Sequence, residues 1–474
     1  MDSFDFESAD GEPEESGRSK KNFDDEINEL KERLKNSGGG STNIEVLEEI
    51  VAFYFEHDKF EEALHFVDLL LEYIPFSAET WQRKGVILNN LQRYQEALES
   101  FEKGLSMNPV DTELILSRGV ALDNLGKHEE ALRCYEGVLE GDPCNEEALF
   151  SKAITLEKLE QWEGALGMLQ SILSLNPDHK DAWYELAFCH DLLGKFDDAV
   201  RSYDTYIDLD PFNHIAWYNR GIVLNRMGQY TKAIESYGMA LAIKDDFGHA
   251  WYNKGNAFAS MGRLHDAVES YKQAIRIDSK DVAAWHNMGN AYEELSMYKE
   301  AIKCFTQAIK YDPQHCESFY GRGSCYDALE QHRKAYNDYT KALSICKNYP
   351  ELWYAKADAA YTLGKWREAL ISYKMVVRYD AANFEAWYDL GETLLEYGYF
   401  KESLKAFNKC ISLHPKWADP FYSRAKVLFL MRKTFDALDS LKTAFELDPE
   451  KKKLFETEFP GVRSIKEITN ILGK

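Results

Sequence analysis

The stretch WYNKGNAF, residues 251–258, brings together side chains that could recognise a ligand. A tyrosine offers a large contact area with a hydroxyl at its tip, and an asparagine both donates to and accepts from a peptide backbone. Tyr252, Asn253 and Asn256 are therefore candidate binding residues. The large apolar side chains of the stretch fall on one face of a helix, and we interpret them as packing residues.

Three rows of such polar side chains recur at intervals of 34 residues. The first row is mostly tyrosine: Tyr184, Tyr218, Tyr252, His286, Tyr320, Tyr354, Tyr388 and Tyr422. One residue further along, the second row holds Asn219, Asn253 and Asn287. The third row begins with Asn256 and Asn290 and continues with Ser324, Asp358 and Glu392. We interpret these rows as a surface that binds an extended peptide of a protein partner.

A separate row of acids occurs two residues before each large apolar residue of the repeat. It consists of Glu79, Glu113, Glu147, Asp181, Glu317, Glu351, Glu385 and Asp419. These carboxylates either select a basic segment of the partner or form a solvated face, and the sequence leaves both readings open.

No arrangement of residues points to catalysis. The chain has no glycine-rich phosphate loop, no HExxH and no GxSxG motif. The twelve histidines are spread along the chain. His128 and His332 occupy one repeat position that elsewhere holds Tyr94 or Phe196, so we interpret them as packing residues. We therefore predict no catalytic residue, no metal site and no cofactor.

The eight cysteines are scattered, without a CxxC pair and without histidine at ligand spacing. This pattern favours reduced thiols over a zinc site or a disulfide framework.

The formal net charge is −24, which disfavours binding to nucleic acid and to anionic membranes. No apolar run approaches the roughly 18 to 20 residues of a membrane span, and the acidic start MDSFDFESAD does not look like a signal peptide. The expected location is the cytoplasm.

A strict period of 34 residues determines how these rows are positioned. A small residue recurs at Ala63, Ala97, Ala131, Ala165, Ala199, Ala233, Ala267, Ala301, Ala335, Ala369, Ser403 and Ala437. Sixteen residues before it stands a large apolar residue such as Trp251, and a glycine or alanine such as Gly255 follows four positions later. Four residues after the recurring alanine comes a mostly aromatic residue such as Tyr271.

These spacings predict two helices in each unit, because each stripe follows i, i+4 and i+7. A glycine inside a helix costs about 0.5–1 kcal/mol relative to alanine, so its recurrence implies a close helix approach. Other glycines, such as Gly126 and Gly262, suit a left-handed end of the first helix, and prolines such as Pro211 suit the end of the second.

The pattern closely resembles the tetratricopeptide repeat, in stretches such as WYELA from Trp183, WYDLG from Trp387 and AVRSY from Ala199. Twelve units cover residues 44–451. The resemblance implies an all-α solenoid, a right-handed superhelix whose first helices line a concave groove. It also implies that tyrosine and asparagine in these rows can serve packing between neighbouring units instead of ligand contact.

The chain departs from the family pattern in two respects. Before the small residue it has lysine or arginine in place of leucine: Lys84, Arg118, Lys152, Arg220, Lys254, Arg322, Lys356 and Arg424. We interpret this row as structural, with an anion-binding row as the alternative. Family members that clamp the C-terminal tail of chaperones carry lysine where this chain has tyrosine, so a chaperone tail is not the expected partner.

The two ends differ from the repeats. Residues 1–43 begin as an acidic tail that we expect to be disordered, followed by a short amphipathic helix with Phe23, Ile27, Leu30 and Leu34 and then a Gly/Ser linker. That helix either caps the first repeat or moves to enter the groove or grip a partner. Residues 452–474 are expected to form a C-terminal capping helix, with a separate targeting helix as the alternative.

The resulting hypothesis is a non-catalytic scaffold or adaptor that binds a protein segment along its groove. The alternative is a structural repeat protein that assembles with copies of itself through ends or edges.

Overall fold

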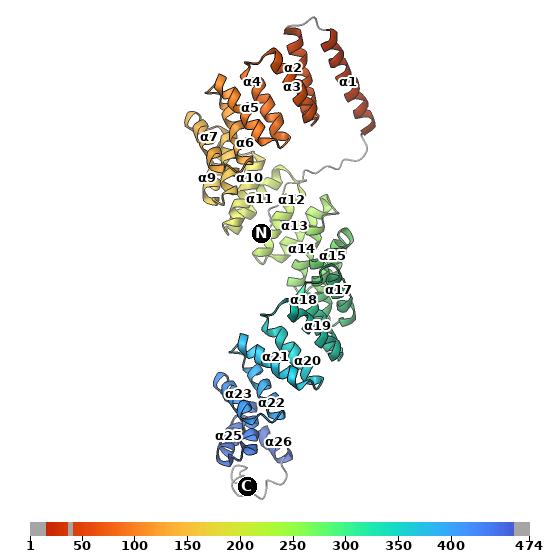
Figure 1. The fold of residues 1–474 in the computed structure, drawn as a ribbon, viewed down its shortest axis with the longest axis vertical. Helices are drawn as coiled ribbons and strands as arrows, with labels where there is room; N and C mark the ends of the chain where they lie inside the picture. Colours follow the sequence, from red (N-terminus) through yellow and green to blue (C-terminus); the bar gives the residue numbers. More distant parts are fainter. Residues whose placement is uncertain (1–15, 37–40, 459–474) are drawn as a thin grey trace. The chain divides into compact units, whose positions relative to one another are not determined.

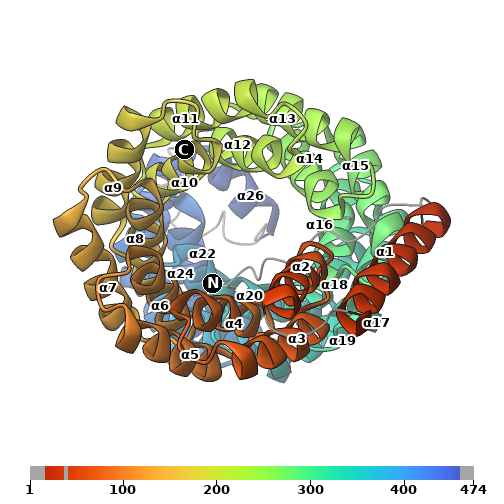
Figure 2. The same ribbon diagram turned by 90° about the horizontal axis from the view of Figure 1, so that it is seen from above.

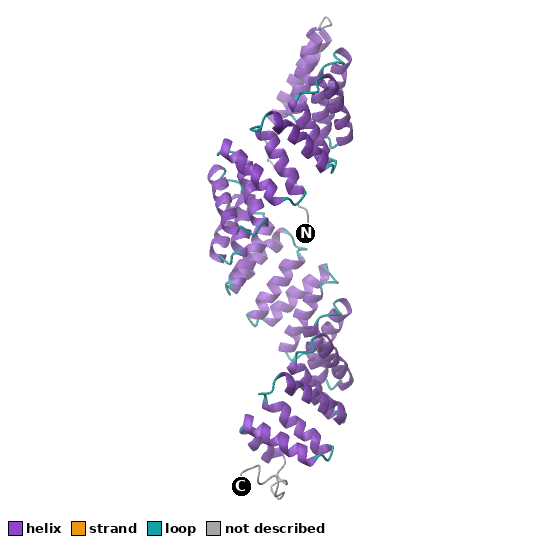
Figure 3. Cartoon of the chain, turned by 90° about the vertical axis from the view of Figure 1, so that its left-hand side faces the viewer, coloured by secondary structure: helices purple, strands orange, loops and turns teal. Residues whose placement is uncertain are grey.

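The computed structural model describes residues 16–36 and 41–458. This part of the chain consists of helices joined by short connections and contains no strand (Figures 1 and 3). It divides into two compact units, residues 1–216 and 217–474, which are treated separately below. Within the described ranges, no helix is both long and apolar enough to cross a membrane.

The helices of the first unit are α1 (Ser16–Asn36), α2 (Ser41–Glu56), α3 (Phe60–Tyr73), α4 (Ala78–Asn90), α5 (Tyr94–Met107), α6 (Thr112–Asn124), α7 (His128–Gly141), α8 (Glu146–Lys158), α9 (Trp162–Leu175), α10 (Lys180–Leu192) and α11 (Phe196–Leu209). Helix α12 (His214–Arg226) includes the boundary between the units.

The helices of the second unit continue with α13 (Tyr230–Ile243), α14 (Gly248–Ser260), α15 (Leu264–Ile277), α16 (Val282–Glu294), α17 (Tyr298–Tyr311), α18 (Cys316–Ala328), α19 (His332–Ile345), α20 (Pro350–Thr362), α21 (Trp366–Tyr379), α22 (Phe384–Glu396), α23 (Phe400–Leu413), α24 (Ala418–Leu430), α25 (Thr434–Leu447) and α26 (Glu450–Glu458).

Each first helix packs against the second helix that follows it, as in α4–α5 and α14–α15. First helices of successive repeats also touch, as in α6–α8 of the first unit and α16–α18 of the second. In Figure 2, α6, α8 and α10 lie on the inner side of the first unit, and α5, α7 and α9 on its outer side. The same order holds for α14 and α16 against α15 in the second unit. The two helices per repeat predicted from the period, and the all-α tetratricopeptide-type solenoid that the resemblance implies, are therefore confirmed.

The recurring glycines allow an aromatic ring to touch the helix backbone. A Cβ on Gly255 would lie 2.6 Å from Cε1 of Tyr271, and one on Gly391 would lie 2.6 Å from Cε1 of Phe407. The aromatic residue stands 16 positions after the glycine in every such pair: Gly85 with Phe101, Gly119 with Tyr135, Gly221 with Tyr237, Gly289 with Phe305 and Gly323 with Tyr339. The predicted close approach of the two helices is confirmed.

The end of the first helix adopts the predicted left-handed conformation. Gly126 and Gly262 have φ values of 75° and 71°. Six other repeats place a non-glycine residue there with φ between 56° and 60°: Asp58, Gln92, Glu160, Ser296, Glu330 and Arg432. The turn geometry therefore belongs to the repeat, and glycine is its least strained occupant.

The recurring tryptophans fasten each connection to the repeat that follows. The indole N–H of Trp251 donates to the carbonyl oxygen of Asp245 at 3.0 Å. Trp183 donates in the same way to Pro177 at 2.8 Å, six residues earlier. Burial of the indole thus stabilises both the helix interface and the preceding turn.

The row of bases joins first helices to second helices. Lys84 pairs with Asp68 at 2.7 Å, and Arg322 pairs with Asp338 at 2.7 Å. Arg220 donates to the Ser236 hydroxyl at 2.6 Å. These contacts agree with the structural interpretation of the row.

Helix α1 lies against α2 in the first unit. The Phe23 ring is 5.0 Å from that of Phe53, and Ile27 is buried. Arg33 Nη1 pairs with Glu49 Oε2 at 2.6 Å. The amphipathic stripe is therefore covered by the first repeat in this structure, which is the capping arrangement.

At the other end, α26 packs Phe455 against Tyr422 and Phe445, with ring centroids 6.4 and 5.9 Å apart. Lys426 of α24 also pairs with Glu458 at 2.8 Å. Most of the helix expected in residues 452–474 lies outside the described residues.

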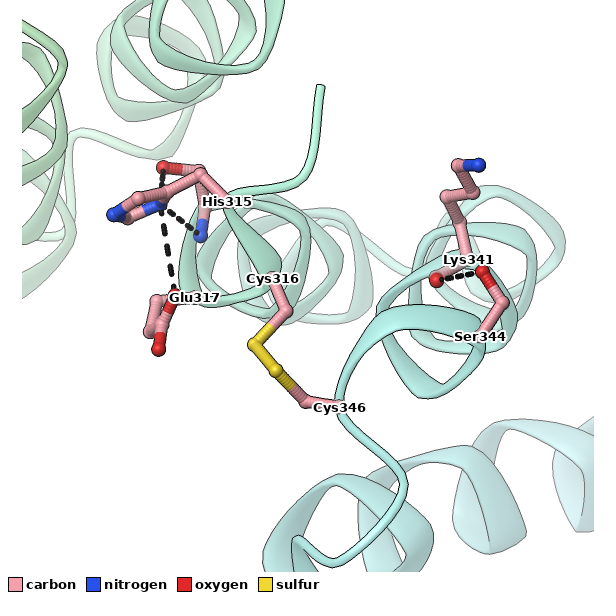
Figure 4. Close-up of a disulfide and its surroundings, with 7 residues drawn as sticks. His315, Cys316, Glu317, Lys341, Ser344 and Cys346 are labelled. Atoms are coloured by element: carbon pink, nitrogen blue, oxygen red, sulfur yellow. Dashed lines mark hydrogen bonds and ion pairs between the residues drawn. A yellow bond between two sulfur atoms is a disulfide. The ribbon is translucent and has the colours of Figure 1, made fainter. Parts of the chain in front are cut away.

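The expectation that all eight cysteines are reduced thiols is wrong. Cys316 and Cys346 form a disulfide, with their Cα atoms 6.3 Å apart (Figure 4). Because α18 and α19 pack as an antiparallel pair, the start of α18 meets the end of α19. The two cysteines are 30 residues apart in sequence, so no local sequence motif predicts their contact.

Candidate functional site

The first tyrosine row packs inward within its own repeat. The ring of Tyr252 lies 6.0 Å from that of Tyr271, which fills the space beside Gly255. The same pairing links Tyr184 with Tyr203, Tyr218 with Tyr237, His286 with Phe305, Tyr320 with Tyr339, Tyr354 with Tyr373 and Tyr388 with Phe407, at 5.6–6.0 Å. One face of each ring therefore contributes to the core, and the polar tip is left at the inner side.

In the second unit, the polar tips are joined from one repeat to the next. Asn253 Nδ2 donates to the Tyr218 hydroxyl at 2.9 Å. Asn287 Nδ2 donates to the Tyr252 hydroxyl at 3.0 Å and to Asn256 Oδ1 at 3.0 Å. Each bond to a tyrosine spans 35 residues, one repeat plus one position.

The network continues to α16 and α18. Asn290 Nδ2 donates to His286 Nε2 at 3.1 Å, and His286 Nδ1 lies 3.1 Å from the Ser318 hydroxyl oxygen. Burial, and secondarily the neighbouring His315, lowers the pKa of His286 to about 4, so its ring is neutral at pH 7. We call Tyr218, Tyr252, Asn253, Asn256, His286, Asn287 and Asn290 the tyrosine–asparagine ladder.

The ladder keeps hydrogen-bonding capacity for a further group. A tyrosine hydroxyl that accepts from asparagine still has its own hydrogen to donate. Asn290 is exposed, and its amide donates to His286. The arrangement can therefore present donors and acceptors at one-repeat intervals along α12, α14 and α16.

A second group of polar residues lies further along the second unit. The Tyr354 hydroxyl donates to Asp389, and the Tyr361 hydroxyl donates to Glu396 at 2.7 Å. Tyr373 donates to Asp358. We call Asp358, Asp389, Glu392 and Glu396, which lie on α20 and α22, the acidic surface.

Helix packing around part of the acidic surface disfavours a charged carboxylate, although Asp358 is exposed and Asp389 and Glu392 are partly buried. Burial raises the pKa of Asp358 to about 6, and it also raises the pKa of Asp389 and Glu392. Carboxylates held in such surroundings are stabilised in their charged form by an incoming cation.

Asp389 was missed by the sequence rows, although it stands in the same repeat position as Asn253 and Asn287. Its repeat position alone could have identified Asp389 as a candidate site residue.

The first unit contains one site residue from the rows, Tyr184, whose ring lies 5.4 Å from that of Tyr206. It also holds a carboxyl pair that the sequence reading missed. Burial raises the pKa of Glu157 to about 7, and burial together with Glu157 raises that of Glu185 to about 8. Cys189 Sγ donates to Glu157 Oε1 at 3.2 Å. Glu185 occupies the repeat position of Asn219, so the same register would have identified it.

Tyr320 and Tyr388 lie apart from the hydrogen-bonded ladder. Tyr320 packs 5.8 Å from Tyr349, and Tyr388 packs 4.6 Å from Trp417. In the described residues, no group of three or more histidine, cysteine, aspartate or glutamate side chains is placed to hold a metal ion.

Family comparisons identify the repeats. Models described as "Tetratricopeptide repeat" match residues 78–111, 112–143, 156–219, 192–248, 282–315, 317–349 and 354–416, and one described as "TPR repeat" matches residues 255–296. Together these matches cover more than half of the chain. No curated protein matches the chain.

Solved structures similar to the chain include YrrB, MamA and part of a TPR repeat-containing protein. YrrB, described as a TPR protein with an unusual peptide-binding site, is 24% identical over 40% of this chain and 98% of its own, with a TM-score of 0.37. MamA is 27% identical over 36% of this chain and 92% of its own, with a TM-score of 0.35. The C-terminal part of a TPR repeat-containing protein from Cytophaga hutchinsonii is 20% identical over 51% and 99%, with a TM-score of 0.46.

Proposed function

Because the chain belongs to the tetratricopeptide-repeat family, we propose that it is a non-catalytic scaffold that binds an extended segment of a protein partner along its first helices. The observation that carries the proposal is the tyrosine–asparagine ladder, whose donors and acceptors recur once per repeat. A main chain in extended conformation offers N–H and C=O groups at regular intervals, which suits such a ladder. We place this scaffold in the cytoplasm.

The acidic surface supports a more specific partner. Asp358, Asp389 and Glu392 lie in surroundings that disfavour their charge, so a lysine or arginine of the bound segment gains a strong interaction there. We propose that one part of the partner segment binds the tyrosine–asparagine ladder through its main chain, and that another part carries basic residues that bind the acidic surface.

The test begins with affinity purification of the full chain and identification of its partners by mass spectrometry. Peptides tiled across each partner are then titrated against the purified chain by fluorescence anisotropy. Asn290→Ala and Asn253→Ala should lower the affinity for the peptide. Asp389→Asn should lower it only when the peptide carries lysine or arginine. Each lost charged or neutral hydrogen bond is expected to cost about 0.5–3 kcal/mol.

Asn337→Ala is the matched control, because Asn337 is an exposed asparagine on the second helix α19. It should leave the affinity unchanged. Thermal melts of all variants separate loss of binding from loss of folding, which matters for Asn253 because it also joins two repeats. Unchanged affinity in folded Asn253→Ala and Asn290→Ala proteins would contradict the ladder as binding surface.

A self-assembling repeat protein is the second candidate, and one observation favours it. Phe76, Val110 and Phe212 stand at the same repeat position in the connections of the first unit, and they are 87%, 82% and 80% exposed. The corresponding residues of the second unit include Asp246 and Lys280, which are polar. Phe76 and Val110 lie in adjacent repeats, where exposed apolar residues close together can mark a contact surface, whereas Cys144 and Asp178 occupy the two repeats before Phe212. Light scattering that gives a strict monomer at high concentration would exclude this candidate.

A further inference from the structure

The disulfide between Cys316 and Cys346 is partly exposed, whereas most of the free cysteines are buried. It joins the first residue of α18 to the residue that directly follows α19 (Figure 4). Cys316 is buried, whereas Cys346 is partly exposed. The nearby thiols of Cys304 and Cys325 are free and buried, and burial raises the pKa of each to about 12. Those thiols are therefore poor nucleophiles, and the disulfide is the reactive sulfur group of this region.

We propose that Cys316 and Cys346 form a redox modification site that exchanges with a low-molecular-weight thiol and its disulfide, of which glutathione is the representative. Disulfides in a reducing compartment are usually transient or redox-sensing, so the proposed cytoplasmic location favours this role over a permanent structural bond. The inference rests on the proposed function for its effect on partner binding and on the proposed location for the choice of glutathione.

The geometry gives the exchange a direction. Cys346 is the more exposed of the two residues, so a glutathione thiolate attacks its Sγ and forms a mixed disulfide there. The bond between the two cysteine sulfurs breaks, and its electron pair leaves on Cys316 as a thiolate that then takes a proton from water. Cys316 is the first residue of α18, where the helix dipole stabilises a thiolate and makes it a better leaving group.

A second glutathione thiolate completes the reaction. It attacks the glutathione sulfur of the mixed disulfide, which releases Cys346 as a thiolate and forms glutathione disulfide. Two glutathione molecules are thereby oxidised by two electrons, and the protein disulfide is reduced to two thiols. The reverse sequence, with glutathione disulfide as oxidant, restores the bond.

The disulfide holds a connection that lacks one of the backbone restraints found in other repeats. In other connections a backbone N–H donates back across the turn, as from His315 to Asp312 at 3.2 Å and from Asn383 to Asp380 at 3.4 Å. Within the described chain, Tyr349 makes no such backbone bond to Cys346, and its side chain does not cap α20. The indole N–H of Trp353 still donates to the Lys347 carbonyl oxygen at 2.8 Å, so opening the disulfide loosens residues 347–349 without releasing them.

Both ends of the disulfide adjoin residues of the inner face. Tyr349, three residues after Cys346, packs its ring 5.8 Å from that of Tyr320. His315, which precedes Cys316, lies 4.9 Å from the ring of His286 in the tyrosine–asparagine ladder. Oxidation fixes both contacts and reduction loosens them, so the redox state regulates how firmly the ladder and Tyr320 are held.

Thiol counting tests the exchange without any reference to binding. The full chain has eight cysteines, of which six are free. Because exposed Cys144 also reacts with glutathione disulfide, the experiment uses Cys144→Ser as background. After native equilibration, all free thiols are labelled under denaturing conditions and counted. We expect five labelled thiols in oxidising glutathione buffer and seven in reducing buffer. Mass spectrometry should identify Cys316–Cys346 as the crosslinked peptide of the oxidised form.

Adding Cys346→Ser to that background should abolish the redox-dependent step, whereas Cys316→Ser should reduce it to one thiol, because Cys346 alone can form only the mixed disulfide with glutathione. A disulfide that stays closed for hours in excess reduced glutathione, a constant seven thiols in both buffers, or a crosslink between other cysteines would each overturn the site.

Hydrogen exchange and binding test the consequence. Reduction should accelerate amide exchange in residues 346–352 on the order of tenfold, while residues of α14 stay unchanged. The peptide found under the proposed function should bind the reduced and oxidised forms with different affinity. Equal exchange in both forms would overturn the coupling. If no peptide binds either form while the thiol count still changes, the proposed function fails and the modification site stands.

Discussion

The position that a Cβ would take on Gly255 is 2.6 Å from Cε1 of Tyr271, closer than any two such atoms can pack. The ring occupies the space of the missing side chain, and its hydroxyl donates to Asn256 Oδ1 at 2.7 Å. One glycine therefore positions both a core ring and a residue of the tyrosine–asparagine ladder.

Gly255→Ala should destabilise the second unit, although alanine is the better helix former. Overpacking costs about 1–3 kcal/mol and outweighs the gain of about 0.5–1 kcal/mol in helix propensity. Gly238→Ala on α13 is the control, because the nearest atom its Cβ would meet is Lys254 Nζ at 3.9 Å. Denaturant unfolding should show the control to be neutral or stabilised. A stabilised Gly255→Ala protein would contradict the close approach.

The period of 34 was sufficient to predict the helix pairs, the close approach at Gly255 and the left-handed turn at Gly262. These features depend on residues within one 34-residue repeat, so their spacing is visible in the sequence. The contact of Asn287 with Tyr252 depends on how one repeat stacks on the next, and no spacing within a single repeat predicts it. The disulfide escaped prediction for a similar reason, because Cys316 and Cys346 meet only when α18 and α19 pack.

The rows also depended on which residue types were considered. The second row contains only asparagine, because an asparagine side chain suits a peptide main chain, and it therefore leaves out Glu185 and Asp389 at the repeat position of Asn253. Only the structure shows that these carboxylates are desolvated, because burial cannot be read from composition.

Breaking the ion pair of Arg322 and Asp338 should cost far more than breaking that of Lys84 and Asp68. Arg322 makes two parallel bonds to Asp338, at 2.7 and 2.8 Å, and Asp338 is 8% exposed. Asp338→Ala leaves the largely buried Arg322 guanidinium with only the Thr306 hydroxyl as partner, and breaking a buried pair in this way typically costs about 3–5 kcal/mol. Asp68 is about half exposed, and Asp68→Ala is expected to cost under about 1 kcal/mol. Urea unfolding compares them, and equal losses would count against the buried pair.

Replacing Glu330 by glycine should stabilise the protein. Glu330 adopts φ of 57° in the left-handed position that Gly364 occupies in the next repeat. A non-glycine residue there carries a penalty of about 1–2 kcal/mol, and glycine loses about 0.5–1 kcal/mol of that gain to its greater unfolded-state entropy. We expect a net gain of up to about 1 kcal/mol by thermal and chemical unfolding. Gly364→Ala is the reciprocal variant and should be destabilised; unfolding curves that move the other way for both would refute the turn argument.

The carboxyl pair of Glu157 and Glu185 should make the first unit less stable as pH rises. Their folded-state pKa values, about 7 and about 8, exceed the ordinary value of 4.5, so the folded state binds more protons than the unfolded state between these limits. The free energy of unfolding therefore falls as pH increases from about 5 to about 8. Glu185→Gln, which cannot ionise, should reduce this slope and be relatively more stable at pH 8 than at pH 5. Glu163→Gln, at an exposed position on α9, is the control and should follow the unmodified chain. Urea unfolding at both pH values measures the difference, and parallel profiles for Glu185→Gln and the unmodified chain would show that the pair is already ionised in the folded protein.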